Sequence, residues 1–541
     1  MKRVLVNSTI LILIAGLVLF LSGCSQENAP EQSAQSSEGR RNPQNVSREG
    51  SGGTGYWPGE NWRVSTPGEQ GMDSGMLADM LRYIQNGQHN IHNIILIRNG
   101  YMVMDANFYP YKNNLKHVVN SCTKSVTSTL VGIAEGEGWI ESTDEKVLDF
   151  FSGIDIQNVD ERKKELSLKH LLTMTAGFQW SENGSYGPDD SWVQMNGSED
   201  PIKYILNLPV LENPGTGFYY NTGAPHLLSA ILQKATNMKT CDYARKKLFE
   251  PIGIKDVFWA EDPEGISTGG AGIFMTPLDM ARFGYLYLRN GCWNGEQIVP
   301  ENWVREATQK QVETPTGLAG RYGYGYQWWM NSCGGYSARG FGGQYIFVVP
   351  QYDIVAVFTS SLPAGWFFLP ENLMGSFIIP AVENFDPDKE ENEGLSKLQN
   401  IVKSIRQQPE SKAVAPLPEK ARRISGKTIE CETGDRIFLK FNTGDNPVSA
   451  EFRHGPSNNI LVGLDDRYHV SNAGVYWPLP DNNSVAAKGG WSGDNRFTIK
   501  LISLHEMDEL TYNFTFDGDN VDVEFLSMYG GELMHTKGKI K

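Results

Sequence analysis

The feature that most constrains the fold of this chain is the placement of strand-like segments at both ends of a block from about residue 61 to residue 385. Near its start, HNIILIRNGYMVMDANF predicts two strands around the turn Arg98-Asn99-Gly100. Near its end, YIFVVP and DIVAVFTS predict two more strands, and helix-like segments fill the middle. The pattern therefore predicts an α+β unit, in which an antiparallel sheet is covered by helices.

The hydrophobic period changes after this block. Residues 423–541 alternate with period two: TIKLISL is one such run, and TYNFTFDGDNVDVEF predicts two strands around Asp517-Gly518-Asp519. This region is predicted to be a small all-β domain, a sandwich or a barrel. Residues 386–422 are predicted to be a linker, with a charge run, a short helix over LSKLQNIVKSIRQQ and the Pro-rich stretch AVAPLPEK.

The N-terminus is predicted to be an export signal. A basic start is followed by about twelve apolar residues, too few to span a bilayer. The run ends in Leu-Ser-Gly-Cys, which resembles a bacterial lipobox, so residues 1–23 are interpreted as a lipoprotein signal peptide and Cys24 as the lipidated residue. The alternative is an uncleaved membrane anchor, and both export the protein to the cell envelope: the outer membrane or periplasmic face, if the cell is Gram-negative. Residues 24–60 are rich in Ser, Gln, Glu and Gly and are predicted to be a flexible linker.

Charge and cysteine content exclude some classes of protein. The net charge of −15 argues against nucleic-acid binding, which needs clustered Lys and Arg. Six cysteines in 541 residues do not make a disulfide scaffold. The pairing of the five cysteines after Cys24 is left open, and Cys122 is interpreted as a packing residue.

The first chemical motif is Ser121-x-x-Lys124 in VVNSCTKSVTSTL. Ser121 opens a predicted helix, and the spacing puts both side chains on one face about one turn apart. A serine hydroxyl needs an adjacent base to become a nucleophile, and a buried lysine can supply one. The N-terminus of the helix favours the negative charge that develops during attack.

Two further motifs strengthen this interpretation. The loop NPGTGFYYNTGA carries Tyr219-x-Asn221 about 100 residues later; a tyrosine beside a lysine ammonium favours its phenolate and can move a proton, and Asn221 can hydrogen-bond Lys124. The stretch ARGFGGQYIFVVP places three glycines before a strand. A backbone N–H of Gly343 or Gln344 is predicted to pair with that of Ser121 as an oxyanion hole.

Together, these three motifs resemble the serine β-lactamase and penicillin-binding-protein superfamily over residues 70–385. The class C-like branch is most similar, and within it TKSVTSTLVGIA, YGYGYQWW and ARGFGGQYIFVVP resemble the 6-aminohexanoate-dimer hydrolases and related esterases. The resemblance implies an α+β fold, with a β-lactamase/transpeptidase-like antiparallel sheet, flanking helices and an all-α region, followed here by the all-β domain. It implies Ser121 as nucleophile, Lys124 as its activator and Tyr219 as general acid/base, with Asn221 in support.

One departure from the superfamily bears on the substrate. Lactamases usually carry Lys-Thr-Gly or His-x-Gly on the third strand, and this chain has Gly340-Phe341-Gly342-Gly343. No cation stands there to hold a carboxylate. Arg339 comes one residue earlier, and alternation turns it to the other face. The sequence therefore favours a small neutral ester or linear amide over a β-lactam.

The remaining pocket residues are weaker candidates. Asp189 or Asp190, in a loop between the first two motifs, are candidates for binding an ammonium group, and Trp328, with Trp329 beside it, for walling an apolar cleft. The alternatives are a solvated loop and core packing. We predict no metal and no cofactor, because no ligand cluster or phosphate loop is present. The sequence leaves the oligomeric state open.

Three functions remain in competition. The first is a lipid-anchored serine hydrolase acting through an acyl-enzyme. The second uses the same scaffold without turnover, as a penicillin-binding, D-amino-acid-peptidase-like or sensory protein. The third assigns function to the all-β domain alone, as a lipid- or glycan-binding module, and the combination of Ser121, Lys124 and Tyr219 argues against it.

Overall fold

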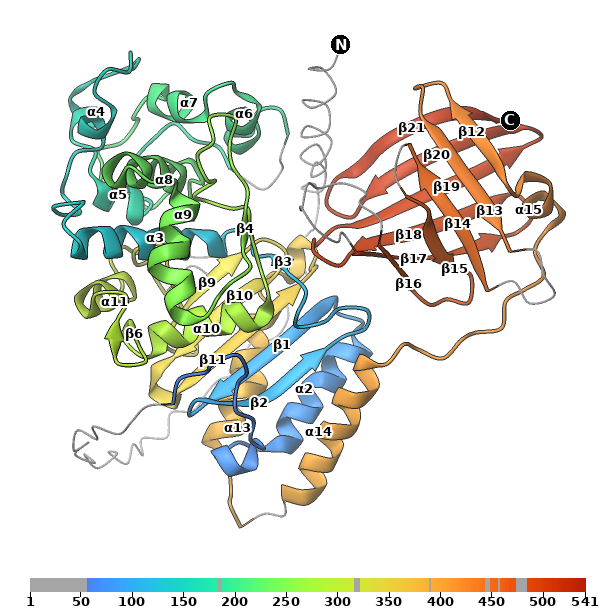
Figure 1. Ribbon diagram of the computed structural model, residues 1–541, viewed down its shortest axis with the longest axis horizontal. Helices are drawn as coiled ribbons and strands as arrows, with labels where there is room; N and C mark the ends of the chain where they lie inside the picture. Colours follow the sequence, from blue (N-terminus) through green and yellow to red (C-terminus); the bar gives the residue numbers. More distant parts are fainter. Residues whose placement is uncertain are drawn as a thin grey trace, which may run out of the picture.

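The computed structural model describes residues 56–182, 187–315, 322–388, 391–442, 448–455, 458–472 and 484–541. It contains a mixed body of helices and sheet, followed by a β-barrel at the C-terminal end (Figure 1). The predicted signal peptide, Cys24 and most of the predicted N-terminal linker lie outside the described residues. In the described part of the chain, no helix combines the length and the apolar character needed to cross a membrane.

The central sheet is built from both ends of the first block, as the sequence predicts. Its strand order is β2-β1-β11-β10-β9-β8, and neighbouring strands are antiparallel. Asn99 and Gly100 have φ of 50° and 76° and form the tight turn between the first two strands. The strands are β1 (Ile91–Arg98), β2 (Tyr101–Asn107), β8 (Trp329–Met330), β9 (Tyr336–Gly340), β10 (Gln344–Val349) and β11 (Ile354–Ser360).

Helices cover both faces of this sheet. Successive side chains of β1 alternate between two cores: Ile95 and Ile97 belong to one, and Ile94 and Leu96 belong to the other. The first core contains α3, α8 and α10, and the second contains α2 and α14. These helices are α2 (Ser74–Asn86), α3 (Cys122–Gly136), α8 (Gly223–Thr236), α10 (Pro277–Leu288) and α14 (Glu391–Arg406).

Short elements complete the first domain, mostly in the helical region between β2 and β8. The helices are α4 (Glu161–Lys164), α5 (Leu168–Leu172), α6 (Ser191–Gly197), α7 (Pro201–Asn207), α9 (Thr240–Ala244), α11 (Glu301–Ala307), α12 (Leu369–Leu373) and α13 (Ile379–Glu383). The strands are β3 (His117–Val118), β4 (Phe258–Trp259), β5 (Ile273–Met275), β6 (Cys292–Trp293) and β7 (Glu296–Gln297).

Part of the predicted linker 386–422 is structural. Helix α14 buries Leu398, Ile401 and Ile405 in the same core as α2, and the two helices lie side by side (Figure 1). These residues are spaced by three and four, so a single narrow stripe packs while the rest of the helix stays polar. Residues 407–418 have no regular structure, and α15 (Glu419–Ile424) leads into the barrel.

The C-terminal strands form a ten-stranded sheet that a parallel pairing of β15 with β17 closes into a barrel. Its interior is filled by the apolar residues of the period-two pattern, such as Ile437, Leu439 and Phe441 of β13. The strands are β12 (Lys427–Cys431), β13 (Arg436–Phe441), β14 (Ser449–His454), β15 (Ile460–Gly463), β16 (His469–Asn472), β17 (Ser484–Ser492), β18 (Arg496–Ser503), β19 (Glu509–Asp517), β20 (Asn520–Ser527) and β21 (Gly531–Ile540).

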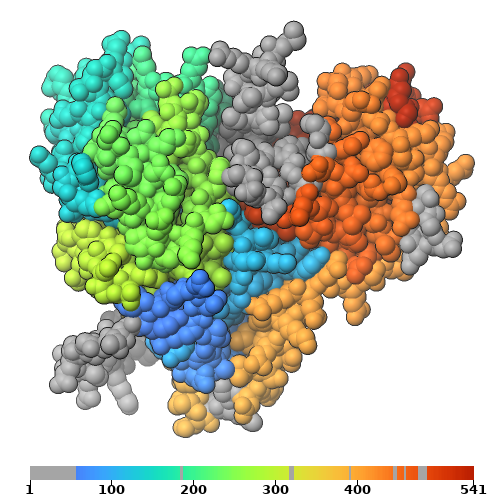
Figure 2. All heavy atoms as spheres, viewed as in Figure 1, coloured from blue at the N-terminus to red at the C-terminus, as the bar shows by residue number. Residues whose placement is uncertain are grey.

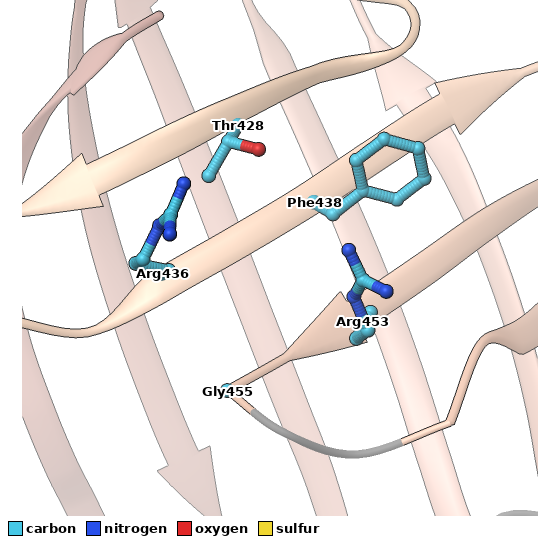
Figure 3. Close-up of a pocket in the computed structure, with 5 residues that line it drawn as sticks. All are labelled: Thr428, Arg436, Phe438, Arg453 and Gly455. Carbon is cyan, nitrogen blue, oxygen red and sulfur yellow. The ribbon is translucent and has the colours of Figure 1, made fainter.

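The barrel packs against the first domain and carries a hollow on its own wall. Its orange and red surface meets a blue part of the first domain in Figure 2. Between the two domains, Tyr111 packs against Ile502 and Leu504. A hollow on the barrel wall is lined by Thr428, Arg436, Phe438, Arg453 and Gly455 (Figure 3). This hollow contains none of the predicted catalytic residues.

Candidate active site

The nucleophile candidate stands where the chain turns into helix α3. Asn120 has φ of 47°, and Ser121 is the N-terminal cap residue of the helix. Lys124 follows one turn later, with 1% of its surface exposed. Its Nζ donates a hydrogen bond of 2.9 Å to Ser121 Oγ. The structure thus brings together the serine and the lysine of the first motif.

Lys124 is held in an almost fully buried position by two further hydrogen bonds. Its Nζ donates to Thr222 Oγ1 at 2.9 Å and to the carbonyl oxygen of Gly270 at 2.8 Å. Burial lowers the pKa of the ammonium to about 8, although the charge of Glu182 opposes this shift. A lysine in this environment is neutral in a substantial fraction of molecules near pH 8.

The structure places Tyr220, rather than the predicted Tyr219, beside the lysine. The Tyr220 ring centroid is 4.8 Å from Lys124 Nζ, and the ring stacks on Trp329 at 6.0 Å. Tyr219 is 53% exposed, and its backbone amide donates to Met174 O at 2.8 Å. Of the two consecutive tyrosines in this loop, Tyr220 contacts the lysine, and Tyr219 lies at the surface.

The same displacement by one residue applies to the predicted Asn221. This residue is buried, and its Oδ1 accepts hydrogen bonds from the amides of Gly223 at 2.7 Å and Ala224 at 3.1 Å. It therefore satisfies the N-terminal amides of α8 and does not bind the lysine. Thr222 makes the contact with Lys124 that the sequence assigned to Asn221.

Glu182 is a site residue that the sequence motifs did not indicate. Its Oε1 accepts a hydrogen bond of 2.6 Å from Thr222 Oγ1, and its Oε2 accepts one of 2.8 Å from the amide of Thr222. The indole Nε1 of Trp180 donates to the same Oε2 at 2.9 Å. A chain of hydrogen bonds thus runs from Lys124 Nζ through the Thr222 hydroxyl to the Glu182 carboxylate. The only sequence signal was an acidic residue in the loop between the first two motifs.

The two acidic residues predicted in that loop have other roles. Asp190 is buried, and its Oδ1 accepts from the amides of Trp192 at 2.9 Å and Val193 at 3.4 Å, which caps helix α6. Its position as the cap explains its burial, and the ammonium-binding role stays a prediction. Asp189 is exposed on the neighbouring turn.

The glycine strand passes directly beside the nucleophile. A Cβ at Gly340 would lie 2.3 Å from the carbonyl oxygen of Val119 and 3.2 Å from Cβ of Asn120, so only glycine fits between these segments. Asn120 Nδ2 donates to the carbonyl oxygen of Phe341 at 2.9 Å. These contacts place the turn between β9 and β10, residues 340–343, against the start of α3. We call this segment the glycine turn.

The amides predicted for the oxyanion hole differ in their availability. The Gly343 amide donates to Gly340 O at 3.2 Å and closes the glycine turn, so it is already paired. Gln344 opens β10 opposite Gly340, and its side chain bonds to Ser360. The Ser121 amide donates no hydrogen bond to another residue within the described ranges. Of these amides, that of Ser121 is available to an oxyanion and that of Gly343 is not.

Arg339 turns away from the nucleophile, as the strand alternation predicts. Its side chain is 9% exposed, donates to Ser337 Oγ at 3.0 Å and Asn331 Oδ1 at 3.0 Å, and lies 3.3 Å from Glu371 Oε2. These interactions hold the guanidinium in the interior behind β9.

Trp328 packs in the core and does not wall a cleft. Its side chain is fully buried, with ring centroids 4.5 Å from Tyr287, 5.3 Å from Tyr336 and 5.9 Å from Phe283. The neighbouring Trp329 is half-buried and carries the contact with the tyrosine that faces the lysine. The substrate-binding role predicted for Trp328 is therefore wrong.

The cysteines of the described residues are all free, which settles the pairing that the sequence left open. Cys122 is buried, and its Sγ approaches the carbonyl oxygen of Gln344 at 3.5 Å, in keeping with a packing role. Burial raises the pKa of its thiol. The free cysteines are Cys122, Cys241, Cys292, Cys333 and Cys431.

Comparisons with known proteins show which proteins this chain is similar to. The Beta-lactamase family model matches residues 82–371. A 6-aminohexanoate-dimer hydrolase of Paenarthrobacter ureafaciens is 23% identical over 274 residues, which cover 46% of this chain and 67% of that protein. Among solved structures, a family VIII carboxylesterase is 14% identical with a TM-score of 0.48, and the match covers 60% of this chain and 99% of the esterase. An octameric penicillin-binding protein homologue from Pyrococcus abyssi is 16% identical with a TM-score of 0.45, and the match covers 86% of this chain and 99% of that homologue.

Proposed function

The chain belongs to the beta-lactamase family, and on this premise we propose that it is a serine hydrolase that cleaves a small amide or ester through an acyl-enzyme. The observation that carries the proposal is the 2.9 Å hydrogen bond between Lys124 Nζ and Ser121 Oγ, with the lysine buried. A buried amine beside a serine hydroxyl is the pairing that activates a serine nucleophile. The 6-aminohexanoate-dimer hydrolase among the relatives supports an amide substrate.

In the first step, Ser121 Oγ attacks the substrate carbonyl and gives its proton to neutral Lys124. The pKa of about 8 supports this role, because the neutral form is then accessible near physiological pH. The amide of Ser121 stabilises the oxyanion, together with an amide of the glycine turn other than that of Gly343. The bond to the leaving group then breaks, and an ester is left on Ser121 Oγ.

Tyr220 passes this proton on in the proposal. Its ring lies beside Lys124, so its hydroxyl can give its proton to the leaving amine or alcohol while the Lys124 ammonium replaces that proton. In the second half of the cycle, water attacks the acyl-enzyme, and the same groups return the proton to Ser121. Thr222 and Glu182 hold the lysine in place and set its charge through their hydrogen bonds.

The polarity around β9 supports a substrate that is uncharged where it meets this strand. Arg339 is engaged with Glu371 in the interior, and the residues of the glycine turn bring no charge to the strand end. A carboxylate at this position would be desolvated without a cation to pair with it. We therefore propose neutral esters and linear amides as substrates, in preference to β-lactams.

A labelling experiment with matched serine variants tests the proposed function. The full chain is treated with a fluorophosphonate probe and assayed with a p-nitrophenyl ester, a linear 6-aminohexanoate dimer and nitrocefin. Ser121→Ala is expected to lose both labelling and turnover, whereas Ser128→Ala is expected to keep both. Ser128 lies on the same helix, and its buried hydroxyl has no hydrogen-bond partner within the described residues. Turnover by Ser121→Ala would refute the proposal, and stable labelling without turnover would indicate a binding protein.

We also propose that Cys24 is lipidated and anchors the chain to the cell envelope. The support is the sequence alone: a basic start, about twelve apolar residues and Leu-Ser-Gly-Cys. Expression with an alkyne fatty acid is expected to label the wild-type chain and not a Cys24→Ala variant. Equal labelling of the two chains would contradict this anchor.

A further inference from the structure

The barrel contacts the segment that leads into the nucleophile. The connection between β18 and β19, residues 504–508, lies along residues 116–118, and we call it the barrel loop. The amide of Val118 donates to His505 O at 2.8 Å, and His505 Nδ1 donates to Lys116 O at 2.7 Å. Because Val118 lies three residues before Ser121, these bonds fix the approach of the chain to α3.

The same loop also touches the glycine turn through Met507. Its Sδ lies 3.1 Å from Asn120 Nδ2, the group that donates to the carbonyl oxygen of Phe341. A Cβ at Gly342 would come within 2.5 Å of this sulfur, so the thioether packs directly on the backbone of the turn. The carbonyl oxygen of Met507 accepts a hydrogen bond from Ser361 Oγ, at the end of the adjacent strand β11.

A second barrel residue, Tyr529, holds the glycine turn from another side. Its ring lies 5.1 Å from that of Phe341, the residue at the tip of the turn. Its hydroxyl donates to Leu362 O at 2.9 Å, and the amide of Leu362 in turn donates to Gly342 O at 3.0 Å. Thus Met507 and Tyr529 contact the turn both directly and through its hydrogen-bonded neighbours.

From these contacts we propose that the barrel is part of the active site, in which Met507 and Tyr529 are positioning residues for the oxyanion hole. Gly342 and Gly343 have φ of 77° and 88°, and neither has a side chain that could lock the turn from within. The hydrogen bond from Asn120 to Phe341 places the turn against the start of α3, and the contacts of Met507 and Tyr529 hold this arrangement from outside. This inference rests on the proposed function, and it assigns the barrel a role in that same reaction.

Methionine variants of the full chain test the inference. Met507→Ala is expected to lower kcat for ester hydrolysis by about 10- to 100-fold while KM changes less than about threefold, because a misplaced oxyanion donor weakens transition-state binding more than substrate binding. Met507→Leu restores an apolar side chain of similar volume and is expected to recover most of the rate. Met528→Ala is the control, since Met528 is 38% exposed on the same barrel.

A tyrosine variant keeps the test decisive if Met507→Ala does not fold. Tyr529→Phe retains the ring beside Phe341 and loses the hydrogen bond to Leu362, and it is expected to lower kcat by about 3- to 10-fold at unchanged KM. Wild-type kcat in both Met507→Ala and Tyr529→Phe, with Ser121→Ala inactive, would overturn the positioning role and leave the proposed function intact. An active Ser121→Ala variant would instead remove the proposed function itself.

Discussion

Replacing Glu182 with glutamine should shift the pH dependence of turnover toward acid. In the proposed mechanism the neutral form of Lys124 is the active form, so kcat/KM rises with pH through the lysine pKa of about 8. The Glu182 carboxylate raises that pKa by stabilising the ammonium. Glutamine removes the charge, the ammonium becomes less favourable, and the rising limb of the profile moves to lower pH.

The geometry sets the size of this shift. Thr222 Oγ1 lies 2.9 Å from Lys124 Nζ and 2.6 Å from Glu182 Oε1, so the charged atoms are at most about 5.5 Å apart. At an effective dielectric constant of about 20, the attraction is about 3 kcal/mol, or about two pKa units. Glu182 is half-buried, and water screens part of this interaction. We therefore expect a shift of about one pH unit.

The assay is the pH profile of kcat/KM for a p-nitrophenyl ester whose leaving group does not limit the rate. The position of the rising limb is the quantity to compare, because a weaker base also lowers the plateau. Asp189→Asn is the control, since it removes an exposed carboxylate from the same loop and should leave the limb in place. If kcat/KM rises at the same pH in Glu182→Gln as in the wild type, the role of neutral Lys124 is refuted. Activity that falls as the pH rises through 8 would refute it as well.

The structure supports three further predictions. Tyr220→Phe should lower kcat by about 10²- to 10⁴-fold, whereas Tyr219→Phe should stay within twofold of wild type in the same ester assay; the reverse order would restore the assignment made from the sequence. Asp190→Ala should lower the free energy of unfolding by about 1 kcal/mol through loss of the α6 cap, measured by urea titration, and a raised KM at unchanged stability would indicate substrate binding instead. Trp328→Ala should lower the free energy of unfolding by about 3 to 5 kcal/mol in the same titration. Trp329→Ala should affect kcat or KM more than stability, and equal effects of the two variants would contradict their separate roles.

The overall architecture follows from patterns that the sequence carries locally. Alternation and β-branched runs identify the strands at both ends of the first block, and the structure confirms their union in one antiparallel sheet. The period-two pattern after residue 423 likewise identifies the all-β domain, which is a closed barrel. The sequence predicts a short helix over 395–408 within a linker, and the structure has α14 there, packed on α2. The packing could not be predicted, because a narrow apolar stripe does not indicate which helix it will contact.

Within the site, the sequence by itself determined the pair on α3, since Ser121 and Lys124 are three residues apart on one helix and their contact follows from helix geometry. Only the tertiary structure decided which of two adjacent tyrosines faces the lysine, because a loop has no fixed period. It also decided that Thr222 and Glu182 complete the hydrogen-bond chain. The barrel loop contacts the residue beside the nucleophile from almost 400 residues away in sequence, as in the contact between Asn120 and Met507. Contacts of this kind depend on how complete domains pack, and no local pattern records that packing.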